Sequence, residues 1–266
     1  MVCPDDVARF SEVCREVLAF ERATPGAEGV GIGRYNEKKM HAALKRFVCA
    51  REECYEIDMG QRYVADILCD GEIYEIQTGS LYPLTKKIAY YLDHTYCHVT
   101  VVHPLARRKK VIWIDPSTGA TTAPSRYSYA EGLRDALAET VYISEAIATG
   151  RVGIWFLFLE EEEYRFLDGY GRDKKRGSSR FERVPVALID ELALSRPEDY
   201  AEFLTDEVPR GRDFTAAEFA RAMKIRGTRD LYRCLIALVN IGVLEKGEKQ
   251  GRSGTWHIKL TKKNDE

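Results

Sequence analysis

Two carboxylates flank a short predicted turn in residues 63–78, the segment with the most side chains that could take part in catalysis. Its sequence is YVADILCDGEIYEIQT. The Asp-Gly pair at 70–71 stands between two alternating runs, which is the strongest short-range signal for a β-hairpin with a two-residue turn. With that turn, Asp66 faces Glu75 across the ladder. Directly opposed residues have Cβ atoms about 4.5–5.5 Å apart. The sequence therefore predicts two neighbouring carboxylates on one face of a sheet.

Like charges placed this way destabilise a sheet unless something compensates them. A hard divalent cation is one such compensation, because Mg²⁺ prefers oxygen ligands. Gln77 lies two residues beyond Glu75 and is expected on the same face. Two simpler interpretations stay open. The acids can lie on a solvated face, or a longer turn can shift the register and send them to opposite faces.

The spacing of Asp66, eight intervening residues and then Glu75-x-Gln77, in a hairpin with a predicted helix on either side, resembles the PD-(D/E)XK nuclease superfamily. The resemblance covers roughly residues 30–115. It implies a restriction endonuclease-like α/β fold, with a mixed central sheet flanked by helices, and hydrolysis of phosphodiester bonds in DNA with Mg²⁺ or Mn²⁺. The sequence departs from the family pattern at Ala65, where the name has proline, and at Gln77, where lysine is usual.

The resemblance also implies metal ligands. These are Asp66, Glu75 and the backbone carbonyl of Ile76, with Glu37 as a fourth candidate from the helix before the hairpin. A metal held there polarises the scissile phosphate and lowers the pKa of a bound water. An acid at the start of a helix also simply favours the helix dipole, so Glu37 has a second interpretation. His41, one turn later, is expected to be a hydrogen-bonding residue at the edge of the core.

Gln77 decides between the functions that the resemblance leaves open. Some restriction enzymes of similar fold use glutamine there, so Gln77 is implied to orient the attacking water or steady the developing charge. Lys86 or Lys87, from the helix expected next, is a possible substitute for the missing lysine. The alternative is a non-catalytic DNA-binding regulator on a degenerate nuclease fold. A third hypothesis is an interaction protein whose surface acids bind no metal.

The elements that must position these residues follow from apolar periodicity and turn signals. Helix, hairpin and crossover alternate over an expected core at residues 1–160, which predicts an α/β fold with a mixed sheet. Helices are predicted over 4–23, 35–50, 81–92 and 128–148, and strands over 54–58, 62–69, 72–77, 98–102, 110–115 and 152–159.

Residues 161–212 are more polar than the core before them and are expected to form a basic loop and a connector. Six bases outnumber two acids over 172–183. A solvated loop is the simplest interpretation, but bases beside small residues also suit contacts to phosphate groups. The candidates for such contacts are Lys174, Lys175, Arg176 and Arg180.

Residues 213–266 resemble a winged helix-turn-helix module. Over residues 213–263, eleven bases face five acids, whereas the whole chain has a net charge of −2. Thr215 and Glu218 form a capping-box pattern that opens a helix. A second helix ends at Gly242, and two short strands follow around a basic loop. The candidate DNA contacts are Arg229, Arg233, Lys249 and Arg252. The alternative is a helical cap that packs on the core and binds no nucleic acid.

Composition excludes several other classes of protein. With 266 residues, 45% of them hydrophobic, the chain has material for a real core. Its longest apolar run, at 152–159, is far shorter than the roughly 20 residues of a membrane helix, and the acidic N-terminus is unlike a signal peptide. Seven scattered cysteines without a C-x-x-C pair argue against a disulfide framework and a ribbon-type zinc site. We expect a cytoplasmic, DNA-binding protein, and the resemblance allows a homodimer.

Overall fold

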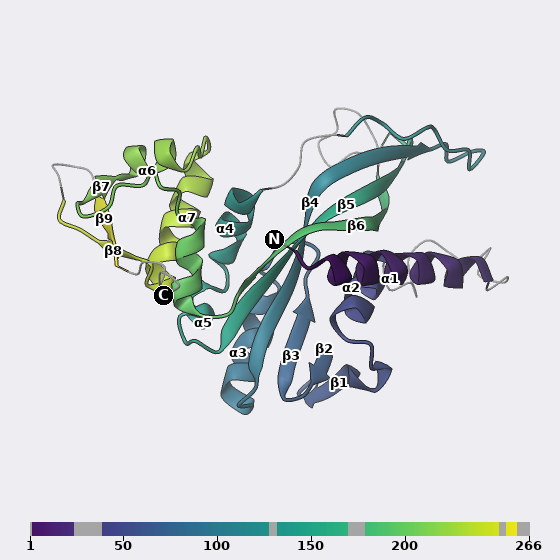
Figure 1. Ribbon diagram of the computed structural model, residues 1–266, viewed down its shortest axis with the longest axis horizontal. Helices are drawn as coiled ribbons and strands as arrows, with labels where there is room; N and C mark the ends of the chain where they lie inside the picture. Colours follow the sequence, from purple (N-terminus) through teal and green to yellow (C-terminus); the bar gives the residue numbers. More distant parts are fainter. Residues whose placement is uncertain (1, 24–38, 128–131, 170–178, 250–253, 260–266) are drawn as a thin grey trace.

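A computed structural model describes residues 2–23, 39–127, 132–169, 179–249 and 254–259 (Figure 1). The helices are α1 (Pro4–Ala23), α2 (Lys39–Val48), α3 (Leu84–His94), α4 (Leu133–Thr140), α5 (Ser144–Ile147), α6 (Ala216–Ala222) and α7 (Thr228–Ile241), with the 3₁₀ helices η1 (Glu52–Cys54) and η2 (Pro197–Phe203). The strands are β1 (Tyr55–Gly60), β2 (Tyr63–Cys69), β3 (Glu72–Ile76), β4 (His98–Ile114), β5 (Val152–Phe166), β6 (Arg180–Leu194), β7 (Phe214–Thr215), β8 (Leu244–Lys246) and β9 (Thr255–Ile258).

The main sheet has six strands in the order β1-β2-β3-β4-β5-β6. The first three strands and the β5–β6 pair are antiparallel, whereas β3, β4 and β5 run parallel. The parallel step from β3 to β4 is made through α3, as a crossover connection requires. The structure therefore confirms the predicted α/β class with a mixed sheet flanked by helices.

Two apolar clusters lie on the two faces of this sheet. Side chains three residues apart in a strand point to opposite faces, so Ile73 and Ile76 of β3 belong to different clusters. One cluster joins the sheet to α1 and α2 through Phe10, Leu44 and Phe47. The other joins it to α3 and α4 and continues into the C-terminal helices. The candidate hairpin β2–β3 is thus held between helices from both sides.

The sheet is longer than the sequence predicted. One strand, β4, replaces the two expected at 98–102 and 110–115, β5 continues to Phe166, and β6 lies inside the expected connector 161–212. The polar sequence of these segments does not predict strands, but their charged side chains pair with opposite charges across the sheet. Lys109 lies 3.3 Å from Glu163, and Arg183 lies 2.6 Å from Glu161. Opposite charges on neighbouring strands stabilise a pairing that a polar pattern alone does not indicate.

The C-terminal elements share a core with the sheet. Thr215 and Glu218 form the predicted capping box, and Gly242 ends α7 in the left-handed conformation at φ 94°. Strands β7, β9 and β8 form a small antiparallel sheet. In Figure 1 these elements make the lobe at the left, beside α4 and α5, which replace the single helix expected over 128–148. Nowhere in the described part of the chain is a helix both long and apolar enough to cross a membrane.

Candidate active site

The predicted hairpin and its register are confirmed. Asp70 and Gly71 form the two-residue turn, with φ of 53° and 81°. Positive φ at both positions is the requirement of a type I′ turn, which Asp-Gly meets at low cost. Cys69 pairs with Glu72, and two further pairs follow in the same register up to Ile67 and Tyr74. The next opposed positions in this register are those of Asp66 and Glu75.

Asp66 lies where the β2–β3 ladder ends. Its Oδ2 accepts a hydrogen bond of 2.7 Å from the backbone N–H of Ile76 and lies 3.4 Å from Nε2 of His41 in α2. Burial raises the pKa of this carboxyl, but the hydrogen bond and charge of His41 and the Ile76 N–H outweigh burial, and the pKa falls below its ordinary value. The side chain keeps 16% of its surface exposed, so Asp66 is an ionised carboxylate that solvent reaches.

Glu75 lies deeper, with 1% of its side chain exposed. Its Oε1 accepts a hydrogen bond of 2.8 Å from the Tyr91 hydroxyl, and its Oε2 accepts one of 2.6 Å from Nζ of Lys87. Burial and then the charge of Asp66 raise the pKa of Glu75 to about 7, and Lys87 offsets part of this rise. The two acids therefore repel each other, as the register predicted, and α3 supplies the compensating cation.

The other predicted residues of the site have different places. Lys87, not Lys86, reaches the acids, because Lys86 points to solvent from the same helix. Gln77 does not turn to the acid pair, since its Nε2 donates a hydrogen bond of 2.7 Å to the carbonyl of Ser80. Glu37 lies outside the described residues.

Tyr91 is a member of the site that the sequence analysis missed. It stands four residues after Lys87, so the two side chains share a face of α3 and bind the two oxygens of Glu75. That spacing is the signal that could have found it. His41 has the predicted role of a hydrogen-bonding residue and makes its contact to Asp66.

The donors of this site fit a hard divalent cation. Two carboxylates with a raised pKa on one of them are an arrangement that a cation stabilises, and their oxygens are the ligands that Mg²⁺ and Mn²⁺ prefer. Asp66 and Lys87 are the partly exposed members, with Lys87 keeping 21% of its side-chain surface. A ligand would have to approach Glu75 from the side of Asp66 and Lys87.

The raised pKa of Glu75 predicts a pH-dependent stability. The folded chain holds the proton on Glu75 up to about pH 7, whereas the unfolded chain releases it near its ordinary value of 4.5. The stability that this proton contributes is present below pH 4.5 and is lost as the pH rises through 7. The free energy of unfolding of the wild type minus that of Glu75→Gln should fall between pH 5 and 8, by as much as about 3 kcal/mol. Urea denaturation in metal-free buffer measures it, and an unchanged difference contradicts the raised pKa.

The residues predicted to contact DNA differ in their positions and exposure. Arg229 of α7 and Lys249, which follows β8, are exposed. Arg233 was expected to contact DNA, but it is partly buried, lies 3.4 Å from Glu139 and donates a hydrogen bond to the Tyr142 hydroxyl. Arg180 begins β6, 3.9 Å from Glu163. Four further candidates lie outside the described residues, namely Lys174, Lys175, Arg176 and Arg252.

Comparison with known proteins yields one finding. Residues 38–195 match the family described as "Domain of unknown function (DUF8091)". This range runs from the start of α2 to the end of β6 and so contains Asp66, Glu75 and Lys87. Neither a curated protein nor a solved structure matches the chain.

Proposed function

We propose that this chain, which belongs to the DUF8091 family of domains of unknown function, is a metal-dependent nuclease that hydrolyses phosphodiester bonds in DNA. The observation that carries the proposal is the meeting of two opposed carboxylates with a lysine. Lys87 lies 2.6 Å from Glu75, whose pKa responds to the charge of Asp66. This set holds the charges that the PD-(D/E)XK motif requires, with the lysine taken from α3 instead of β3.

Asp66 and Glu75 are the residues that would hold the metal. A divalent ion held by these two carboxylates would polarise a phosphate and lower the pKa of a bound water. The hydrogen bond from the Ile76 N–H fixes Asp66 at the end of the ladder, and the hydroxyl of Tyr91 in α3 fixes Glu75. Held ligands of this kind lose little entropy when they bind an ion, which favours binding.

Lys87 has two roles in this mechanism. Its ammonium compensates the buried charge of Glu75 in the free protein. If Glu75 held a metal, the same ammonium would be available to a bound phosphate and would stabilise the negative charge that develops on its oxygens. Gln77 donates its hydrogen bond to the carbonyl of Ser80, so we assign the role of the third motif residue to Lys87.

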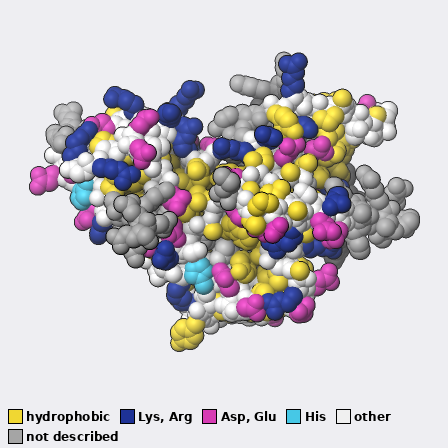
Figure 2. Space-filling model, viewed as in Figure 1, with side chains coloured by type: hydrophobic (Ala, Val, Ile, Leu, Met, Phe, Trp, Pro, Cys, Tyr) yellow, Lys and Arg dark blue, Asp and Glu magenta, His cyan; other side chains and the backbone are white. Residues whose placement is uncertain are grey.

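The C-terminal lobe is the part of the chain proposed to bind the DNA backbone. Its order of strand, two helices and two strands supports the proposal of a winged-helix-like module. Figure 2 shows Lys and Arg side chains spread over this lobe, at the left, with acidic side chains among them. Arg229 and Lys249 are exposed members of the module, which suits contacts to phosphate groups without reading of sequence.

A non-catalytic DNA-binding regulator is the second candidate, and one observation favours it. Both oxygens of Glu75 already have protein partners, and almost none of the side chain is exposed. Such a carboxylate serves as a structural link between β3 and α3 if no ion displaces Lys87. The two candidates differ in cleavage, not in DNA binding.

The test is cleavage of labelled DNA by the purified chain with Mg²⁺, Mn²⁺ or EDTA. We expect cleavage with either metal, none with EDTA, and DNA affinity that falls with salt. Lys87→Met should lower the cleavage rate about a hundredfold, because it removes one preorganised charge from the site. Lys86→Met is the matched control and should leave the rate unchanged, since Lys86 is exposed one residue away.

The other outcomes separate the alternatives. Salt-dependent binding without cleavage under any metal identifies the regulator. Absence of salt-dependent binding identifies an interaction protein. Equal rates for the two lysine variants mean that Lys87 has no part in cleavage.

A further inference from the structure

Three cysteines that are distant in sequence meet at the turn end of the hairpin β2–β3. The sulfur atoms of Cys49, Cys54 and Cys69 all lie within 4.8 Å of one another. Cys49 is buried, and Cys54 and Cys69 are half-buried. The sulfurs of Cys49 and Cys69 are 3.6 Å apart. This cluster is distinct from the candidate active site, which contains no cysteine.

Each thiol is placed by local backbone structure. Cys49 follows the last residue of α2, and its N–H still donates to the carbonyl of Lys45 at 3.0 Å. The 3₁₀ helix η1 then turns the chain back, with a 3.1 Å hydrogen bond from the Cys54 N–H to the carbonyl of Arg51. Cys69 ends β2, directly before the type I′ turn. The group is thus formed by a helix end, a turn and a strand end that the fold fixes.

The spacing of the sulfurs fits a tetrahedral zinc site. Zinc–sulfur bonds of about 2.3 Å at tetrahedral angles place the sulfur atoms about 3.8 Å apart. The distance of 3.6 Å between Cys49 and Cys69 and the limit of 4.8 Å for the group are close to that value. Oδ2 of Asp70 lies 3.6 Å from the Cys69 sulfur, but Asp70 does not belong to the group whose ligand atoms all lie within 4.8 Å of one another. We infer that Cys49, Cys54 and Cys69 bind Zn²⁺, with a water molecule as the fourth ligand.

Charge around the cluster suits this ion. Three thiolates carry three negative charges, of which Zn²⁺ neutralises two. Arg51 supplies a further positive charge, since its Nη2 lies 2.5 Å from both the Cys69 sulfur and Oδ2 of Asp70. A guanidinium beside coordinating thiolates is the outer support that metal ligands usually have.

Two other chemistries are less suited to the cluster. A disulfide needs sulfurs about 2.05 Å apart and uses two cysteines, which leaves the third without a role. Mg²⁺ prefers oxygen, so the ion proposed for Asp66 and Glu75 does not compete for the thiols. The zinc site would link α2 and η1 to β2, and it does not depend on the proposed nuclease activity.

The experiment titrates the reduced, metal-free full chain with Co²⁺ and then Zn²⁺, in excess Mg²⁺. We expect one equivalent of Co²⁺ to give intense sulfur-to-cobalt charge-transfer absorption, which Zn²⁺ then removes. Cys49→Ser, Cys54→Ser and Cys69→Ser should each lower the Zn²⁺ affinity at least about tenfold. Cys97→Ser is the matched control, because Cys97 is also half-buried and lies outside the cluster.

A second measurement needs no variant. Zn²⁺ should protect three cysteines of the wild-type chain from alkylation, and peptide mass spectrometry should identify them as Cys49, Cys54 and Cys69. Absence of the charge-transfer band overturns the proposal, as does protection of other cysteines. A Cys49–Cys69 disulfide in the oxidised chain, together with no Zn²⁺ binding after reduction, overturns it in favour of a redox pair.

Discussion

Asp66→Asn is expected to lower metal-dependent DNA cleavage about a thousandfold or more while leaving DNA affinity unchanged. The substitution removes one of the two carboxylate charges proposed to hold the metal, and loss of a single preorganised electrostatic group in an enzyme already costs about a hundred- to a thousandfold. DNA affinity should persist because the proposed backbone contacts lie on the C-terminal lobe. Rates with Mg²⁺ and Mn²⁺ and a salt-dependent binding titration measure the two effects separately.

Asparagine is chosen because it preserves the local structure. Its side-chain oxygen can still accept the hydrogen bond from the Ile76 N–H, which Asp66 accepts at 2.7 Å. A truncation to alanine would leave that N–H without its partner at the end of the ladder, which costs stability as well as charge. Removing the charge at Asp66 should also lower the pKa of Glu75, because Asp66 contributes to its rise.

Asp93→Asn is the matched control, since Asp93 is an exposed acid in α3. It should cleave at the wild-type rate. If Asp66→Asn also cleaves at that rate, the acid pair does not hold the catalytic metal, or the cleavage comes from a contaminant. Either result removes the support for the nuclease proposal.

Local signals made the hairpin predictable. The Asp70-Gly71 turn fixes the register by itself, because its positive φ angles match the twist of the two flanking strands. The register in turn placed Asp66 and Glu75 near each other without any tertiary information. The same holds for the capping box at Thr215, whose two partners are three residues apart.

Contacts between distant segments were not predictable in the same way. The choice of Lys87 over Lys86 depends on the rotation of α3 against the sheet, which apolar packing of Leu84, Ile88 and Tyr91 sets. The cysteine cluster forms only where three elements meet in the fold, and the spacing of the cysteines in the sequence does not indicate it. Strand β6 was not predicted because charged residues such as Arg180 and Arg183 find their partners on the neighbouring strand β5.

Packing between distant segments also bears on the domain boundary expected at residue 213. The sequence suggested a separate C-terminal module, since charge and pattern change there. In the structure one apolar cluster runs from the sheet through α4 and η2 into α6 and α7. Asn240 of α7 also donates a hydrogen bond of 3.0 Å to Ser144 of α5. This continuity predicts that the lobe and the sheet unfold together.

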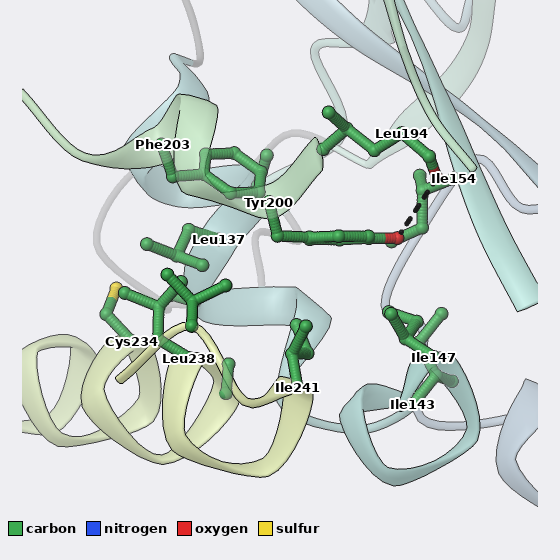
Figure 3. Close-up of a cluster of buried hydrophobic side chains, with 14 of the residues drawn as sticks. Leu137, Ile143, Ile147, Ile154, Leu194, Tyr200, Phe203, Cys234, Leu238 and Ile241 are labelled. Carbon is green, nitrogen blue, oxygen red and sulfur yellow. Dashed lines mark hydrogen bonds between the residues drawn. The ribbon is translucent and has the colours of Figure 1, made fainter. Parts of the chain in front are cut away.

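Tyr200→Ala is expected to lower the free energy of unfolding by about 3–5 kcal/mol, the usual cost of deleting a large buried aromatic side chain. Tyr200 is fully buried in η2. Figure 3 shows its ring lying between side chains of the sheet, such as Leu194, and those of α7, such as Leu238 and Ile241. The substitution therefore opens a cavity at the junction of the lobe and the sheet. Urea denaturation followed by circular dichroism measures the loss.

Two matched variants separate the cavity from other effects. Tyr200→Phe removes only the hydroxyl, which donates a long hydrogen bond of 3.4 Å to the carbonyl of Leu194, so it should cost about 1 kcal/mol or less. Tyr232→Ala deletes a tyrosine that is 48% exposed on α7 and should change stability by no more than about 0.5 kcal/mol. The wild type should unfold in one transition, because the described residues of the lobe share one apolar cluster with the sheet. A second transition confined to the lobe, with the sheet unaffected by Tyr200→Ala, would show that residues 213–266 are an independent domain.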